Sequence, residues 1–386
     1  MALPISYNIR SLYVRRKVTL LAVGGIALVV AVLIVLVAMA NGFFIALSAT
    51  GTPGNAILTQ RGSGSELTSG ISRENARVLE VDDRVMRDDQ GRPLASPEMV
   101  VVASMRRKDG ADVNVVVRGV TQMAFTVRSG ITVSDGRNIQ SGLYEVIIGR
   151  RIYERMVGME IGRSIRLQRR DWQIVGVFDA GGSGFESEIW GDFEVMAPAF
   201  NRGGYQSVTL RMRDPSAISA FNEELERNPR VQVQAIQERK YYEDQAGQVS
   251  GSLLGLAVFV AIVMGVGAIF GAMNTMYAIV AARTREIGTL RALGFSKISV
   301  LTAFVIESTF LAVVGGLLGC LVALPANGIS SAAGGANFAE VAFAFRITGT
   351  SLAVGMTLAV VMGVAGGVLP AFRAARVPIT SALRDA

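Results

Sequence analysis

Four long apolar runs dominate the pattern of hydrophobic and polar residues along this 386-residue chain. They cover residues 18–47, 249–281, 298–324 and 347–371. A helix needs about 20 apolar residues to cross a bilayer, and each run reaches that length. The pattern therefore predicts an α-helical membrane domain with four transmembrane helices.

Residues 48–248, between the first and second spans, follow a different pattern. Short β-branched runs with partial alternation predict strands at 56–60, 99–104, 112–120, 145–148, 164–167 and 172–178. Capping residues and a glycine stop predict helices over 72–79, over 150–157 and after Asp214. Roughly 200 residues are enough for a domain with its own core. We therefore expect one mixed α/β domain, placed outside the membrane between helices 1 and 2.

Arginine and lysine gather at particular ends of the spans, and this asymmetry predicts the topology. Basic residues place 1–17, 282–297 and 372–386 in the cytoplasm, so 48–248 and the short loop 325–346 are expected outside. The first basic segment should form an amphipathic helix at the interface. A secretory signal peptide also places basic residues before an apolar run, but this run exceeds the usual core of about 7–15 residues. We expect a retained anchor, with both termini cytoplasmic.

Composition narrows the chemistry that the chain can perform. Hydrophobic residues make up 51% of it and charged residues 18%, and much of the net charge of +7 lies at the ends of the spans. That placement indicates contact with membrane lipid and argues against nucleic-acid binding. The chain has no histidine and one cysteine, Cys320, which we interpret as a packing residue of the third span. We predict no catalytic residue, no metal site and no cofactor bound by this chain.

The segment between the second and third spans has the most distinctive charge pattern. Its charged residues are four cations and one acid, namely Arg283, Arg285, Arg291, Lys297 and Glu286. Its apolar residues recur at helical spacing, at Ile287, Leu290, and Leu293 or Gly294. An amphipathic helix over 282–297 would offer this apolar face to a partner. The alternative is a plain cytoplasmic turn whose arginines only set the orientation of the chain.

The third span contains an acid, Glu307, which lies roughly 15 Å into the helix when counted from Lys297. A charge at that depth must find a partner, face water or become neutral. A packing or gating role and a proton relay are both open. The relay is the weaker interpretation, because the sequence shows no second ionisable residue within the spans.

Glycines give the spans small faces for close helix contact. Those of the third span are Gly315, Gly316 and Gly319; the second span has Gly265, Gly267 and Gly271, and the fourth has Gly363, Gly366 and Gly367. Packing within the chain and dimerisation would both use such faces, and the sequence does not divide the two.

A glycine-rich stretch over 180–192 combines aromatic and acidic residues in the outer domain. These are Phe185, Trp190, Glu186, Glu188 and Asp192. An exposed loop would present them to a partner or substrate outside the membrane. The alternative is a hairpin whose aromatic side chains are buried.

Three stretches of the sequence resemble a known family. The words ARTREIGTLRALGFS, IES and GGLLG closely resemble the signature of FtsX-like and MacB-type ABC transporter permeases, and residues 147–198 resemble the MacB periplasmic core domain. The tail resembles the closing motif of that family, with Pro370, Arg373, Pro378 and Arg384 as counterparts. The resemblance implies that the segment after the second span contacts a nucleotide-binding subunit, through Arg283, Arg285, Glu286, Ile287, Leu290, Arg291 and Gly294.

The resemblance further implies a function and a set of partners. The sequence has no GxxxxGK[ST] loop, so we expect a permease subunit that is not itself an enzyme. ATP and Mg would be bound by a cytosolic ABC ATPase subunit, and a second permease subunit would complete a homodimer in the bacterial inner membrane. ATP hydrolysis would move the outer domain, a process called mechanotransmission, to export drug, peptide or lipid-like substrates. A periplasmic adaptor protein is a further candidate partner.

Other functions remain open at this stage. An FtsX-like regulator of a cell-wall hydrolase and a lipoprotein-releasing permease would share the same membrane architecture. A membrane-anchored scaffold or enzyme without any ATPase belongs to a different class, and it predicts that no nucleotide-binding protein copurifies.

Overall fold

The computed structural model of this protein describes residues 16–335 and 338–376. The described chain divides into two compact units that interleave in sequence. We call the first the helical unit; it comprises Met1–Asn41, Ser250–Ile329 and Phe345–Ala386. We call the second the α/β unit; it comprises Gly42–Val249 and Ser330–Ala344. The interfacial helix predicted over 1–17 falls almost wholly outside the described residues.

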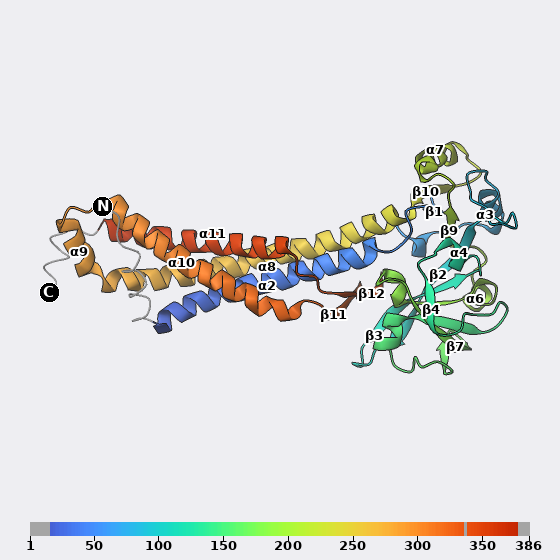
Figure 1. The fold of residues 1–386 in the computed structure, drawn as a ribbon, viewed down its shortest axis with the longest axis horizontal. Coiled ribbons are helices and arrows are strands. Elements are labelled where there is room, and N and C mark those ends of the chain that lie inside the picture. The colour runs from blue at the N-terminus through green and yellow to red at the C-terminus, as the bar shows by residue number, and fades with distance from the viewer. Residues whose placement is uncertain (1–15, 336–337, 377–386) are drawn as a thin grey trace. The chain divides into compact units, whose positions relative to one another are not determined.

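Long apolar helices form the helical unit, as the hydropathy pattern predicts. Their bounds are Arg16–Ser48 for α2, Glu238–Ala282 for α8, Lys297–Ala323 for α10 and Gly349–Ala375 for α11, and the short helix α9 covers Thr284–Ala292. Within residues 16–335 and 338–376, four helices are long and apolar enough to cross a membrane, and these are α2, α8, α10 and α11. They run alongside one another in Figure 1. The Ser296 side chain caps α10, and Thr348 with Ser351 forms a capping box on α11.

Glycines set the contacts between these helices. A Cβ atom added to Gly319 would lie 2.6 Å from the Ala27 carbonyl oxygen on α2, and one added to Gly315 would lie 3.0 Å from Ile26 Cβ. A Cβ on Gly316 would lie 2.8 Å from Ala359 Cβ on α11. These three glycines therefore serve close packing within the chain, because no larger residue fits without a shift.

The α/β unit is built on a mixed sheet with the strand order β10-β1-β9-β2-β3-β8-β5-β7-β4, and β6 pairs with β7. The strands are β1 (Asn55–Gln60), β2 (Ala95–Arg106), β3 (Asp112–Val120), β4 (Thr132–Gly136), β5 (Glu145–Gly149), β6 (Ser164–Leu167), β7 (Arg170–Asp179), β8 (Glu188–Asp192), β9 (Ser207–Arg211) and β10 (Val233–Gln237). The helices are α3 (Arg73–Glu80), α4 (Ala124–Val127), α5 (Arg150–Arg155), α6 (Phe193–Ala199) and α7 (Ile218–Arg227). Short 3-10 helices cover Glu66–Thr68 (η1), Gly184–Ser187 (η2), Pro215–Ala217 (η3) and, in the helical unit, Leu324–Ala326 (η4).

The predicted elements of the α/β unit are present. Every predicted strand is observed, although β2 begins earlier than its β-branched run. The Ser72 side chain caps α3 by accepting a hydrogen bond from the Asn75 N–H. Asp214 caps the turn that precedes α7, and Ile218, Phe221 and Leu225 of α7 are buried. The fold class of a helical domain plus a mixed α/β domain is therefore confirmed.

The loop predicted over 325–346 contains a β-hairpin of β11 (Ser330–Gly335) and β12 (Phe338–Ala344). Phe343 is buried and its ring meets that of Phe43 edge to face, with 5.6 Å between centroids. Glu340 forms ion pairs with Arg107 at 3.5 Å and Arg155 at 3.4 Å. The hairpin thus belongs to the α/β unit. Its small residues have little strand propensity, so these tertiary contacts decide the structure.

The exposed loop predicted as one interpretation of 180–192 is wrong. Phe185 is 4% exposed and Trp190 is fully buried, and Glu186, Glu188 and Asp192 are buried as well. Residues Glu188–Asp192 form β8, which lies in the sheet between β3 and β5. The acids are tolerated inside because arginines and backbone N–H groups bind them. The aromatic side chains are therefore buried, as the alternative predicts, but the stretch is not a hairpin, because β5 lies between β7 and β8 in the sheet.

Candidate functional site

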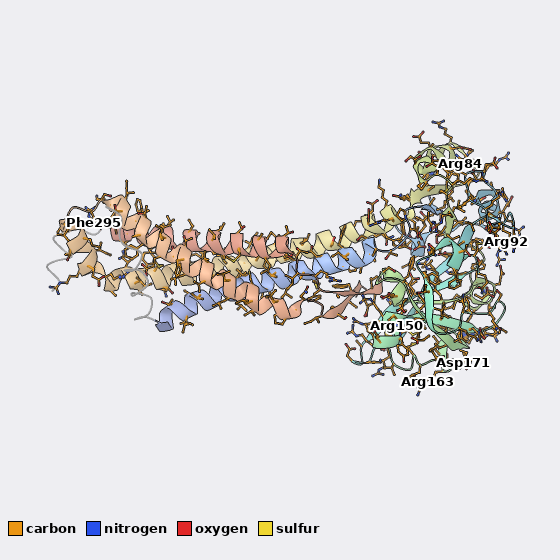
Figure 2. All side chains as sticks on the ribbon, in the orientation of Figure 1. Arg84, Arg92, Arg150, Arg163, Asp171 and Phe295 are labelled. Atoms are coloured by element: carbon orange, nitrogen blue, oxygen red, sulfur yellow. The ribbon has the colours of Figure 1, made fainter. Side chains whose placement is uncertain are left out.

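The turn between α8 and α10 is built by α9 and by a glycine that ends it. Gly294 has a φ of +95°, a conformation that costs most other residues roughly 1 kcal/mol or more. The Phe295 N–H donates to the Leu290 carbonyl at 3.1 Å, and the Gly294 N–H donates to the Arg291 carbonyl at 3.2 Å. This pair of bonds is a Schellman motif, which closes the helix end and turns the chain toward α10. Phe295 marks this end of the helical unit in Figure 2.

The apolar face predicted for docking is divided in the structure. Ile287 is only 3% exposed and packs into the helical unit, in a cluster that includes Val280, Phe304 and Ala374. It therefore anchors α9 to α8, α10 and α11, and the expectation that it is available to a partner is wrong. The neighbours that do face outward are Arg285, Glu286 and Leu293, with Leu290 and Arg291 half-buried.

Arg283 does not belong to that outward face either. It stands at the N-cap of α9, its residue is 8% exposed, and its side chain points into the helical unit. Its Nη1 atom lies 3.1 Å from Oε2 of Glu307 on α10, and its Nε atom lies 3.5 Å from Oε2 of Glu286. Glu307 is 2% exposed, so the pair sits in a desolvated environment.

This ion pair answers the question that the sequence left open about Glu307. Its partner Arg283 lies outside the predicted spans, at the junction of α8 and α9, 24 residues earlier in the chain. A long arginine side chain reaches into the helical unit from that junction. Removing one partner of a buried pair typically costs about 3–5 kcal/mol, so Arg283 and Glu307 hold each other in place. The packing or gating role stays a prediction.

The remaining predicted residues lie elsewhere on the helices. Pro370 is buried inside α11, and the Arg373 guanidinium lies 5.6 Å from the centre of the Tyr277 ring of α8. Pro378 and Arg384 lie outside the described residues. The structure therefore brings together Arg283, Glu286, Ile287 and Glu307, and Ala371 and Ala374 of the closing-motif segment share the cluster of Ile287.

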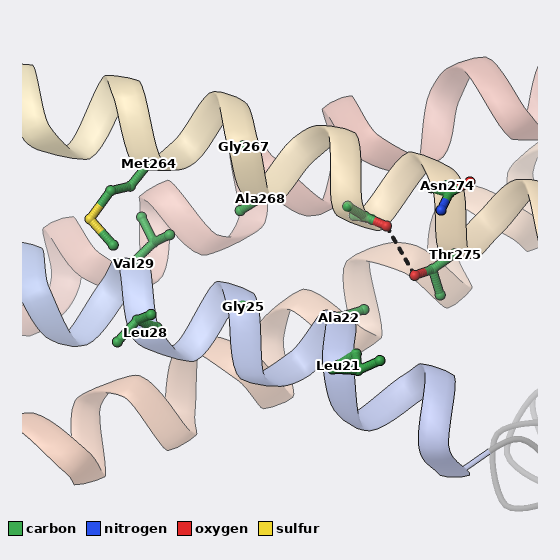
Figure 3. A pocket seen from close by; sticks show the side chains of 12 residues that line it. Leu21, Ala22, Gly25, Leu28, Val29, Met264, Gly267, Ala268, Asn274 and Thr275 are labelled. Carbon is green, nitrogen blue, oxygen red and sulfur yellow. Dashed lines mark hydrogen bonds between the residues drawn. The ribbon is translucent and has the colours of Figure 1, made fainter.

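A groove between α2 and α8 is the cavity of the helical unit that Figure 3 shows. Its volume is about 520 Å³, and it is lined by Leu21, Ala22, Gly25, Leu28, Val29, Met264, Gly267, Ala268, Gly271, Ala272, Asn274 and Thr275. The Thr275 hydroxyl donates to the Gly271 carbonyl at 2.9 Å. Because the lining carries no charge, the groove offers no acid–base or metal chemistry. No group of metal-ligating side chains is found elsewhere in the described residues.

The α/β unit contains a buried ionic network that no pattern in the sequence predicts. Its members are two arginines and four glutamates: Arg118, Arg128, Glu66, Glu98, Glu188 and Glu238. Arg118 lies 2.7 Å from Glu188 and 2.8 Å from both Glu66 and Glu98. Arg128 pairs with Glu98 and, at 2.7 Å, with Glu238. These acids are scattered over 173 positions of sequence, from 66 to 238, so no local motif announces them.

Electrostatics within this network keep Glu66 ionised. Burial alone raises the pKa of Glu66, but attraction to Arg118 and hydrogen bonds from Arg118 and Ser207 outweigh it and lower the pKa to about 2. Trp190 donates its indole N–H to Glu188 at 2.7 Å. The network holds no nucleophile or metal site, and we interpret it as structural.

Comparisons with known proteins identify the two parts of the chain. The family of MacB-like periplasmic core domains matches residues 19–228, and the family of FtsX-like permease C-terminal domains matches residues 258–379. A macrolide export ATP-binding/permease protein MacB of Neisseria gonorrhoeae is 22% identical over 400 residues, covering 98% of this chain and 60% of the relative. The MacB protein of Brucella abortus is 28% identical over 233 residues, covering 57% and 34%. An uncharacterized ABC transporter permease of Methanocaldococcus jannaschii is 25% identical over 207 residues, covering 51% of each chain.

Solved structures resemble part of this chain. The extracellular domain of the noncanonic ABC-type transporter YknZ from Gram-positive bacteria has a TM-score of 0.37 at 19% identity, covering 47% of this chain and 99% of that domain. The periplasmic region of MacB from Actinobacillus actinomycetemcomitans has a TM-score of 0.38 at 13% identity, covering 52% and 94%. The chain spans 34% and 60% of the Brucella and Neisseria relatives. The match of the MacB-like core family to more than half of the chain, together with the FtsX-like match, shows that this protein belongs to the MacB/FtsX-type family of ABC transporter permeases.

Proposed function

We propose that this permease couples ATP hydrolysis by a separate cytosolic ABC ATPase to movement of its α/β unit outside the membrane. In this proposal α2, α8, α10 and α11 are the transmembrane spans, and the main part of the α/β unit lies between the first two. Both termini and α9 face the cytoplasm of a bacterial inner membrane. The excess of basic residues around α9 supports that orientation.

The exposed face of α9 carries the proposal. This helix is fixed to the helical unit by Ile287, yet it presents Arg285, Glu286 and Leu293 to solvent, and Leu293 is 73% exposed. A large apolar side chain beside charged groups at a helix end is typical of a contact surface. A partner that binds there would push on a helix whose opposite face is embedded among α8, α10 and α11.

Two permease subunits and two ATPase subunits would form the working assembly, with ATP and Mg bound by the ATPase. The relatives from Neisseria and Brucella are named for macrolide export. We extend that name to a substrate class of drug, peptide or lipid-like molecules, handed outside the membrane to a periplasmic adaptor.

Variants of the exposed face of α9 test the ATPase contact. Leu293→Asp and Glu286→Lys should reduce the copurifying ATPase and its turnover by roughly tenfold or more, because an unpaired charge in an apolar contact costs several kcal/mol. Leu290→Asp should act in the same way, although its half-buried side chain also bears on the stability of α9. The measurement is quantitative mass spectrometry of the complex purified in nanodiscs, with its rate of ATP turnover.

Val81→Asp is the matched control for Leu293→Asp. Val81 is 63% exposed and also stands at the C-cap of a helix, but it lies on α3 of the α/β unit. This variant should keep the ATPase bound. If the α9 variants also bind and drive the ATPase at wild-type levels, α9 is not its contact surface.

A further inference from the structure

The ion pair of Arg283 and Glu307 joins three elements of the helical unit. Arg283 stands where α8 ends and α9 begins, and its guanidinium contacts both Glu286 on the first turn of α9 and Glu307 inside α10. The two ends of this contact differ in exposure. The Glu286 side chain is 55% exposed, whereas those of Arg283 and Glu307 are 9% and 1% exposed. The guanidinium therefore connects a surface acid of α9 to a fully buried acid of α10.

The presence of a buried ion pair is not explained by its contribution to stability. Taking two charges out of water costs more than an apolar pair of similar volume, so such pairs are best explained where they fix a register or a switch. Apolar contacts such as those of Ile287 hold α9 in place but are non-directional. The ion pair, in contrast, ties one point of α9 to one point of α10, because either charge alone in this environment is unfavourable.

The neighbourhood of Glu307 extends the connection to α11. A Cβ atom added to Gly367 of α11 would lie 1.9 Å from Ser308 Oγ, and one added to Gly363 would lie 2.3 Å from Ala312 Cβ. Interiors packed this tightly transmit displacement, since neither helix can slide without a clash. A displacement of α10 at Glu307 is therefore shared by α11.

We propose that Arg283 is a positioning residue that carries displacement of α9 to α10 and α11 through Glu307. The inference rests on the proposed function, in which an ATPase moves α9. When the ATPase shifts the outward face of α9, Arg283 moves with the N-cap of that helix. Glu307 follows, because moving Arg283 alone would break the charge-assisted contact of 3.1 Å inside the helical unit, where losing a partner of a buried pair is costly.

The native cysteine offers a direct readout of α10. Cys320 is the single cysteine of the chain, and it stands on α10 thirteen residues beyond Glu307, half-buried. The experiment measures the rate at which a membrane-permeant maleimide labels Cys320 in the permease–ATPase complex, without nucleotide and with ATP trapped by vanadate. The variants are Arg283→Gln, Glu307→Gln, Arg283→Lys and the charge swap Arg283→Glu with Glu307→Arg. Arg376→Gln, an exposed cation at the end of α11, is the matched control.

The expected result is a nucleotide-dependent change in labelling rate in the wild type and in Arg376→Gln. Arg283→Gln and Glu307→Gln should lose this change while still binding the ATPase, and Arg283→Lys and the charge swap should regain at least part of it. A structural role alone would not produce rescue by the swap.

Two other results would overturn the inference. If Arg283→Gln and Glu307→Gln keep the full nucleotide-dependent change in labelling rate, the ion pair carries no displacement. The same conclusion follows if the wild type turns over ATP but its Cys320 labelling rate does not depend on nucleotide. Failure of the proposed function looks different, because no ATPase would copurify with the wild-type chain at all.

Discussion

The α/β unit and the helical unit of this permease bury charge in different ways. In the α/β unit, Arg118 and Arg128 are each shared between buried glutamates, and the network links strands, η1 and the start of α8. In the helical unit, the buried pair of Arg283 and Glu307 stands among apolar side chains and tightly packed glycines. The first arrangement joins six charged side chains, and the second joins Arg283 to Glu307 and to Glu286.

The difference follows from what each architecture requires. Long helices satisfy their own backbone groups, so close packing of small residues is enough to join them. The α/β unit must instead hold together segments that are far apart in sequence. Glu238, for example, accepts hydrogen bonds from the Thr52 N–H at 2.9 Å and the Asn55 side chain at 2.8 Å, besides its pair with Arg128. Packing alone can join the helices, so a buried ion pair among them is a stronger indication of function than a buried ion pair in the α/β unit.

The largest effect is expected when Arg118 is replaced by methionine. Arg118→Met would leave Glu66, Glu98 and Glu188 without their shared cation, and it should lower the free energy of unfolding of the α/β unit by about 3–5 kcal/mol. Trp172 and Trp190, the two tryptophans of the chain, are both buried in this unit, so their fluorescence reports its unfolding in the full-length protein. Arg227→Met is the control, because that side chain is 82% exposed. A loss below about 1 kcal/mol for Arg118→Met would mean that the network is dispensable.

Acid should weaken the same network. The pKa of Glu66 falls from an ordinary 4.5 to about 2 on folding, so its contribution is complete above pH 4.5 and is lost as the pH falls through 2. The shift corresponds to about 3 kcal/mol. Tryptophan-monitored unfolding between pH 6 and pH 2 should show this loss in the wild type. Glu66→Gln should flatten the dependence over that range, and an equally steep curve for the variant would assign the acid sensitivity to other carboxylates.

Close packing in the helical unit predicts a smaller effect that depends on position. Gly363→Ala would place a Cβ 2.3 Å from Ala312 Cβ, and overpacking of this kind costs about 1–3 kcal/mol. Gly271→Ala is the matched control, since nothing lies within 4 Å of its added Cβ. The helical unit contains no tryptophan, so its thermal unfolding is measured by the reaction of Cys320 with a fluorogenic thiol reagent during heating. Equal midpoints of thermal unfolding for Gly363→Ala and Gly271→Ala would show that close packing at Gly363 does not contribute to stability.

Much of the fold could be predicted from the sequence because its signals are local. Apolar runs of span length indicate α2, α8, α10 and α11, and the Ser72 and Asp214 caps locate the starts of helices. The hairpin of β11 and β12 could not be predicted in the same way. Its sequence is poor in β-formers, and the contacts of Glu340 and Phe343 with residues more than two hundred positions away stabilise it.

The candidate site was only half predictable for a similar reason. Helical spacing located α9 and its outward residues, but spacing does not say which face of a short helix packs against its own chain. Ile287 and Arg283 turned inward because the ends of α8, α10 and α11 surround them. The partner of Glu307 was missed since an ion pair across 24 residues leaves no periodic signal.

The smallest effect is expected for a charge pair that is exposed to solvent. Arg73 and Glu194 lie 3.3 Å apart on the α/β unit, with side chains 42% and 62% exposed. Exposed pairs contribute about 0–1 kcal/mol, so Glu194→Gln should change the tryptophan-monitored stability by less than about 0.5 kcal/mol. Arg73→Ala should cost somewhat more, because it also removes the guanidinium that lies 5.2 Å from the centre of the Phe193 ring. If Glu194→Gln lowered the free energy of unfolding as much as Arg118→Met, burial would not determine how much an ion pair contributes to stability. The difference expected between the buried network and the surface pair would then be absent.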